Sequence, residues 1–159
     1  AQGEQRLPHI FNSGRDIPGK IEDPRIETLD GERVNQLVKG ERYVVRYRAV
    51  FSRAQDKVRF GFLFKTKIGI ELAGRATAGP NDPMPDYAAG SVAEVRFEFT
   101  CNFLSGIYFI NVGMNANTGE ERRSIHRIMD AVMFEVLPIR DETLSGIIDI
   151  GIQASAKNG

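Results

Sequence analysis

At 159 residues, the chain is long enough for a single domain with a sizeable hydrophobic core, since domains usually contain about 100–200 residues. Its residues are 42% hydrophobic and 26% charged, which is typical of a globular protein and excludes a disordered one. Lysine plus arginine balance aspartate plus glutamate at 21 each, which argues against a general nucleic-acid binder, because phosphate binding requires excess positive charge.

The first half of the chain predicts a linker and then a series of short strands. Residues 1–20 contain prolines and glycines without a sustained period, so we expect a linker and a chain that is part of a longer protein. Apolar residues alternate after the linker, and Asp30-Gly31 and Lys39-Gly40 provide hairpin-type turns. The alternation predicts strands over residues 25–29, 34–38, 42–51, 58–66 and 68–72.

The second half continues the pattern after a long irregular stretch. Residues 74–90 hold three prolines and predict a loop. Strands are predicted over 91–101, 108–114, 131–137 and 144–152, with a polar loop over 115–123 and an ambiguous segment over 124–130 that is compatible with a helical turn. At least eight short strands without a helical period predict an all-β fold, a two-sheet antiparallel β-sandwich of the immunoglobulin-like or jelly-roll type over residues 21–152, followed by a tail over 153–159.

The stretch from Leu104 to Met114 is the centre of this prediction. Tyr108 follows the Ser105-Gly106 turn at the start of a strand, which suits a tyrosine corner whose hydroxyl bonds to nearby backbone. Tyr108 and its alternate neighbours face the core, so Phe109 and Asn111 should point away from it.

Motifs of common enzymes and cofactor sites are missing from the sequence. It lacks a phosphate-binding loop, a dinucleotide glycine fingerprint, an HExxH zinc motif and a nucleophile elbow. The single Cys101 excludes an intramolecular disulfide and a cysteine-built zinc site. Asp82, Asp86 and Asp130 could bind calcium but more often such residues cap turns. We therefore expect no cofactor, no metal and a binding module rather than an enzyme.

Outward residues of three strands are predicted to form one surface, which we call the outer panel. In sandwich order, the strand of Phe109 should lie between those of Arg59 and Met133. Aromatic or thioether surface can support a pyranose ring, while planar polar groups bind its hydroxyls. Alternatively, the apolar members are covered by the long loop or a second subunit. The panel comprises Arg59, Leu63, Lys65, Phe109, Asn111, Met133 and Glu135, and all except Leu63 are our candidate carbohydrate-binding residues.

Several segments together resemble the C-terminal domain of Wzt-type proteins, the ATP-binding subunits of bacterial ABC exporters of O-antigen polysaccharide. The resemblance extends from about residue 25 to 152 and rests on order and spacing more than on any single motif. The segments that carry it are Phe60-Gly-Phe-Leu-Phe64, the strand from Gly90 to Phe99, Leu104-Ser-Gly-Ile-Tyr-Phe-Ile-Asn-Val112 and Asp130-Ala-Val-Met-Phe-Glu-Val136.

The resemblance implies a non-catalytic module that binds the terminally modified end of the polysaccharide and couples it to export. It implies an upstream nucleotide-binding domain, a membrane transporter subunit, and a homodimer that exchanges C-terminal strands, for which residues 144–152 are suited. Such a protein would lie in the cytoplasm at the inner face of the inner membrane. The alternative function is a structural dimerisation or interaction domain without glycan binding. The sequence has no Trp, so an aromatic sugar platform must use Phe or Tyr.

Overall fold

The computed structural model describes residues 9–11, 16–118, 121–140 and 142–159, and in these ranges it consists of strands and loops. None of the described residues lies in a helix that could cross a membrane. The strands are β1 (His9–Phe11), β2 (Gly19–Thr28), β3 (Arg33–Val34), β4 (Gln36–Leu37), β5 (Arg42–Phe51), β6 (Arg59–Thr66), β7 (Glu71–Ala76), β8 (Val92–Thr100), β9 (Gly106–Thr118) and β10 (Glu121–Val136).

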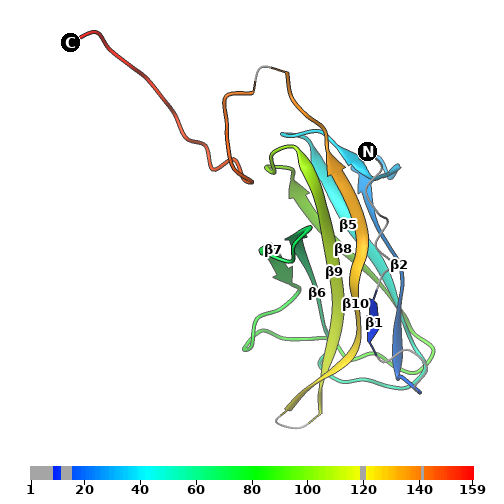
Figure 1. Cartoon of the computed structure of the whole chain (residues 1–159). Helices are drawn as coiled ribbons and strands as arrows, with labels where there is room; N and C mark the ends of the chain where they lie inside the picture. Colours follow the sequence, from blue (N-terminus) through cyan, green and yellow to red (C-terminus); the bar gives the residue numbers. More distant parts are fainter. Residues whose placement is uncertain (1–8, 12–15, 119–120, 141) are drawn as a thin grey trace.

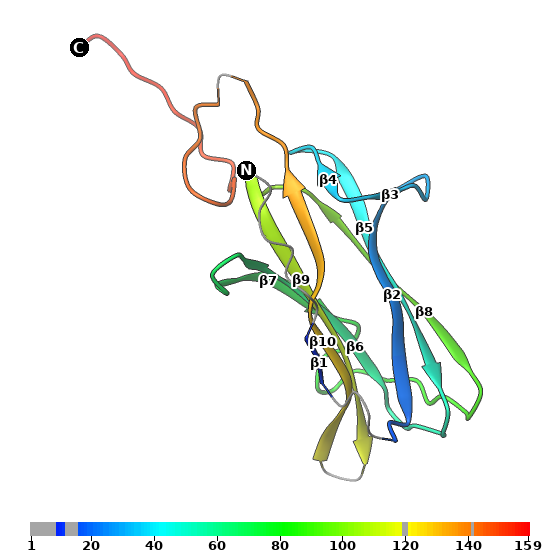
Figure 2. The same cartoon turned by 45° about the vertical axis from the view of Figure 1, so that its right-hand side comes forward.

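Two sheets form the predicted sandwich (Figure 1). Sheet A has the order β1-β10-β9-β6-β7, with β4 pairing in parallel beside the end of β10. Sheet B has the order β3-β2-β5-β8. The turned view in Figure 2 separates the two layers along their length. The predicted placement of β9 between β6 and β10 is confirmed.

The core lies between the sheets because alternate residues of each long strand are apolar. On β5, Tyr43, Val45, Tyr47, Ala49 and Phe51 are buried, and β6, β8, β9 and β10 supply the facing residues. The predicted tyrosine corner is confirmed, since the buried Tyr108 hydroxyl donates to the carbonyl oxygen of Leu104 at 2.6 Å. Phe109 and Asn111 belong to the opposite face of β9, as expected from the alternation.

The β9–β10 hairpin differs from the prediction. Residues 115–123 are mostly part of two paired strands rather than a polar loop, and 124–130 continue β10 rather than forming a helical turn. This end of the hairpin lacks a clear apolar face. It forms paired strands nevertheless, because strand pairing requires only backbone hydrogen bonds. Two irregularities, between Ser124 and His126 and between Ile128 and Val132, interrupt the alternation within β10 and concealed its length.

Both ends of the chain also depart from the expectation. Within the expected linker, β1 pairs with β10, while residues 1–8 and 12–15 lie outside the described residues. Residues 144–152 form no strand here and make one bridge, between Ile148 and Phe103. After this bridge the chain leads away from the sandwich (Figure 1). The backbone of this segment bonds to that of residues 102–104, and the described residues show no further strand pairing for it.

His126 connects the two sheets through a buried hydrogen bond. Its Nδ1 atom accepts a hydrogen bond from the backbone N–H of Ile21 on β2 at 2.9 Å, and the side chain is 2% exposed. Burial, and secondly the charge of Lys20, lower the pKa of His126 below its ordinary value of 6.5. The folded chain therefore holds this imidazole neutral, because a proton on Nδ1 would remove the acceptor.

We expect the free energy of unfolding to fall as the pH drops below 6.5. The unfolded chain then binds a proton that the folded chain resists, at a cost of up to about 1.4 kcal/mol per pH unit. Urea denaturation between pH 7 and 5 measures this slope, and His126→Asn should flatten it because an amide oxygen can accept without titrating. His9→Gln, which removes the only other histidine, should retain the slope; equal flattening in both variants would contradict the assignment.

Candidate functional site

The strand register places the members of the outer panel on three adjacent strands of sheet A, as predicted. Lys65 of β6 and Met133 of β10 both lie opposite Phe109 of β9, and Leu63 lies opposite Asn111. Arg59 lies opposite Asn115, six residues further along β9 than Phe109, which corresponds to about 20 Å of strand. The panel therefore follows sheet A lengthwise rather than forming one compact patch.

The exposure expected for the panel is wrong at its centre. Phe109 is 2% exposed, and Lys65 and Asn111 are each 8% exposed, although all three point away from the core. Arg59, Met133 and Glu135 are half-buried. Sequence alternation identifies which face a residue occupies, but it does not reveal whether that face is covered. Direct contact with solvent is thus limited to the last three residues and Leu63.

The buried centre of the panel is a polar cluster. The Nζ atom of Lys65 lies 2.6 Å from the Oδ1 atom of Asp130, and both side chains are at most 10% exposed. The Asn111 side-chain oxygen accepts a hydrogen bond from the backbone N–H of Asp130 at 2.9 Å. Asp130 has a positive φ of 54° within the second irregularity of β10, so these contacts stabilise a backbone turn that few residues tolerate. This cluster links three strands.

Beyond the cluster, the same face of sheet A contains an open hollow of about 430 Å³, which we call the arginine hollow. This volume falls in the range of small-molecule sites, about 300–1,000 Å³. Its polar side chains come from β6, β9 and β10, namely Arg59, Asn115, Arg122, Ser124 and Arg127. Arg122 donates hydrogen bonds to Asn115 and to the sulfur of Met84, which belongs to the long loop between β7 and β8.

Two glycines form the floor of the arginine hollow. Gly61 of β6 and Gly113 of β9 lie opposite each other, and neither has the positive φ that would require glycine. A Cβ atom at Gly61 would make only ordinary contact, 3.5 Å from the Arg75 carbonyl oxygen, and one at Gly113 would lie 3.3 Å from Cγ of Arg127. The space above Gly61 is therefore open to close approach of a ligand, whereas the stem of Arg127 lies over Gly113.

The floor is supported from inside the sandwich by Tyr47. The Tyr47 hydroxyl donates to the Gly61 carbonyl oxygen at 2.9 Å and lies 3.3 Å from that of Gly113. Burial raises the pKa of Tyr47, and the hydrogen bond to Gly61 opposes that rise only in part. The neutral hydroxyl thus remains a donor, and it connects β5 of sheet B to the two glycine strands of sheet A.

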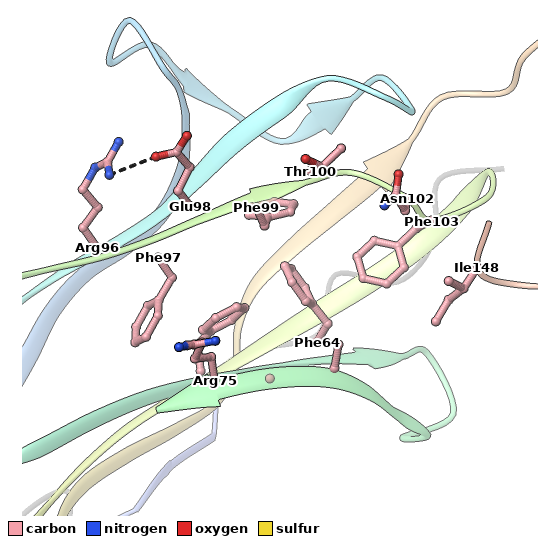
Figure 3. Close-up of a pocket in the computed structure, with 13 residues that line it drawn as sticks. Phe64, Arg75, Arg96, Phe97, Glu98, Phe99, Thr100, Asn102, Phe103 and Ile148 are labelled. Atoms are coloured by element: carbon pink, nitrogen blue, oxygen red, sulfur yellow. Dashed lines mark hydrogen bonds and ion pairs between the residues drawn. The ribbon is translucent and has the colours of Figure 1, made fainter. Parts of the chain in front are cut away.

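A second concavity of about 550 Å³, the aromatic cleft, lies where edge strands β7 and β8 face each other (Figure 3). Five rings from β6, β8 and the following segment line it: Phe62, Phe64, Phe97, Phe99 and Phe103. Figure 3 places the Arg96–Glu98 ion pair at its rim and Ile148 of the C-terminal segment near Phe103. The cleft is therefore mainly apolar, with polar groups at its margin.

The calcium alternative gains no support from the carboxylates. Asp82 accepts from the backbone N–H of Gly79, Asp86 accepts from that of Lys57, and Asp130 pairs with Lys65. Among the described residues, no three His, Cys, Asp or Glu side chains form a group that could hold a metal ion.

Sequence reasoning missed most of the arginine hollow. Of its polar side chains, only Arg59 was a candidate, because Asn115 and Arg122 fell in a predicted loop. The glycines at 61 and 113 were a usable signal: each interrupts an outward-facing row in a strong strand.

One protein family matches most of the chain. The model of the Wzt C-terminal domain family matches residues 17–150. The chain is similar to a solved structure described as the crystal structure of the C-terminal domain of Wzt, with a TM-score of 0.80 and 22% identity, over 96% of this chain and 90% of that chain. At this identity, the structural similarity establishes the fold alone.

Two further solved structures have TM-scores too low to bear on function. One is the alkylpurine DNA glycosylase AlkC of Pseudomonas fluorescens, at 0.47 and 13% identity over 76% of this chain and 30% of that one. The other is a β-glucosidase from Listeria innocua, at 0.40 and 13% identity over 81% and 16%. Comparison with curated protein sequences gives no match.

Proposed function

The chain belongs to the Wzt C-terminal domain family, and on this premise we propose that it binds the terminally modified end of an O-antigen polysaccharide without catalysis. In this proposal it gives substrate recognition to an ABC exporter. An upstream nucleotide-binding domain and a membrane transporter subunit would complete the assembly at the cytoplasmic face of the inner membrane.

The observation that carries the proposal is the arginine hollow on the outer face of sheet A. Sugar hydroxyls require planar polar partners at fixed angles, and Arg59, Asn115 and Arg122 supply these above a floor without side chains. The outer panel extends from Arg59 along the sheet for about 20 Å, and its half-buried members Leu63, Met133 and Glu135 leave accessible surface for further sugars beyond the hollow.

The six candidate residues have two roles in this proposal. Arg59, Met133 and Glu135 are half-buried and would contact the glycan directly. Lys65, Phe109 and Asn111 are buried, and they would hold β6, β9 and β10 in the arrangement that shapes the surface.

Filling the hollow should weaken glycan binding. We expect Gly61→Leu to weaken binding of the purified O-polysaccharide at least tenfold, because the side chain would occupy the space above the floor. Isothermal titration calorimetry measures the affinity. Gly61→Ala, which adds one methyl group, should have a smaller effect and serves as the size control.

Thermal unfolding of both variants separates loss of the site from loss of the fold. Unchanged affinity in a folded Gly61→Leu variant would place glycan binding elsewhere, with the aromatic cleft as the next surface to test. Absence of binding by the unmodified chain would favour the alternative, a structural dimerisation domain.

The proposal includes a homodimer that exchanges C-terminal strands. Ile148, Ile150 and Ile152 are 38%, 78% and 69% exposed and alternate along residues 144–152. The segment already reaches the aromatic cleft, where Leu104 N–H donates to Ile147 O and Asp149 N–H donates to Asn102 O. The edge of β8 runs directly into residues 102–104, so a partner's segment could pair along it and place its isoleucines in the cleft.

A further inference from the structure

The arginine hollow concentrates positive charge in a chain whose net charge is zero. Arg59, Arg122 and Arg127 line it, and no Asp or Glu of the described chain does so. Three arginines of sheet B, by contrast, have acidic partners: Arg42, Arg46 and Arg48 pair with Glu98, Glu27 and Glu22, respectively. Arg59 and Arg122 therefore differ from these arginines of sheet B, since neither has an acidic partner among the described residues.

The positive charges in the hollow repel each other. Partial burial, and secondly the nearby charge of Arg59, lower the pKa of the Arg122 guanidinium. The guanidinium of Arg122 is nevertheless fixed in place by Asn115 and Met84, neither of which neutralises it. A bound anion would relieve this repulsion, and guanidinium groups match the two oxygens of a phosphate or carboxylate.

The floor of the hollow admits such a group close to the backbone. Gly61 and Gly113 lie side by side and project no side chain. Arg59 and Arg122 line the hollow from β6 and β10, and the stem of Arg127 lies over Gly113. Ser124 and Asn115, opposite each other in the register, add hydrogen-bonding groups for the neighbouring sugar.

We infer that the arginine hollow binds an anionic group of the glycan, a phosphate or a carboxylate carried by a sugar, so that the recognised saccharide is acidic rather than neutral. This inference rests on the proposed function and names the substrate class of that same site. Arg59 and Arg122 are the principal ligands of the anion.

The test compares three sugars that differ in charge: glucose, glucose 1-phosphate and glucuronic acid. NMR titration of the full chain, with each sugar added up to about ten times a Kd of 1 mM, detects weak binding. At least one charged sugar should bind at least tenfold more tightly than glucose, because a charge-assisted hydrogen bond contributes more than a neutral one. The charged sugar that binds more tightly shows whether the recognised anionic group is a phosphate or a carboxylate.

Matched variants assign the effect to the hollow. Arg59→Gln and Arg122→Gln should each reduce affinity for that charged sugar at least tenfold. Arg123→Gln removes the same charge from the neighbouring exposed position, which does not line the hollow, and should leave affinity unchanged. Equal losses in the Arg122 and Arg123 variants, equal affinity for all three sugars, or no binding of either charged sugar would overturn the inference.

The polysaccharide separates this inference from the proposed function. If the folded Arg59→Gln variant binds intact O-polysaccharide as the unmodified chain does, the anion assignment fails and glycan recognition stands. If the unmodified chain binds a charged sugar but not the polysaccharide, the proposed function fails and the anion site stands.

Discussion

Replacing Lys65 by Met should lower the free energy of unfolding by about 3–5 kcal/mol, because it breaks a buried ion pair by removing the ammonium group 2.6 Å from the Asp130 carboxylate. Methionine retains most of the apolar stem of lysine, so the loss reports the ion pair rather than a cavity. Urea denaturation at neutral pH measures the change.

A second substitution distinguishes loss of the ion pair from loss of packing. Asn at position 130 tolerates the left-handed backbone there and carries no charge, so Lys65→Met combined with Asp130→Asn should recover a substantial part of the stability. If Lys65→Met costs less than about 1 kcal/mol, the pair behaves as a solvated surface ion pair.

Deleting residues 144–159 should convert the proposed dimer into a monomer. Burial of Ile148, Ile150 and Ile152 against a partner would contribute about 1.5–3 kcal/mol each, so their loss should weaken association by at least a thousandfold. Size-exclusion chromatography with light scattering gives the mass directly. Deletion of only 154–159 is the matched control and should retain the dimer.

The folded state of the shortened chain is checked by circular dichroism, since residues 144–159 contribute little to the core. A truncated chain with dimer mass, or a full chain with monomer mass at micromolar concentration, would contradict strand exchange.

Strands with one apolar face were predictable from the sequence, and others were not. The strand of residues 42–51 was predicted at its observed bounds, and the 58–66 and 91–101 predictions were within one residue of β6 and β8 at each end, because apolar and polar residues alternate along them. Residues 115–118 and 121–130 were mispredicted because they pair through backbone hydrogen bonds, which no side-chain period reports, and because two irregularities shift the register.

The candidate site was predictable in its location but not in its exposure. Alternation placed Phe109, Asn111 and Lys65 on the outer face of sheet A, and the strand order β10-β9-β6 brought them together. Their burial depends on what packs over that face and on the Lys65–Asp130 contact, which joins positions 65 residues apart in the sequence. The arginine hollow was missed because its floor is formed by two glycines, which have no side chain to contribute to a pattern.

The hydroxyl of Tyr47 gives the outer face a preorganised floor. It holds the carbonyl groups of both glycine strands from within the sandwich, so the backbone beneath a ligand is ordered when the chain folds rather than when the ligand arrives. The entropy loss that weakens recognition by mobile loops is thereby reduced. It also follows that recognition on one layer is sensitive to substitutions in the other, since a change in β5 can disturb a saccharide surface with which it has no direct contact.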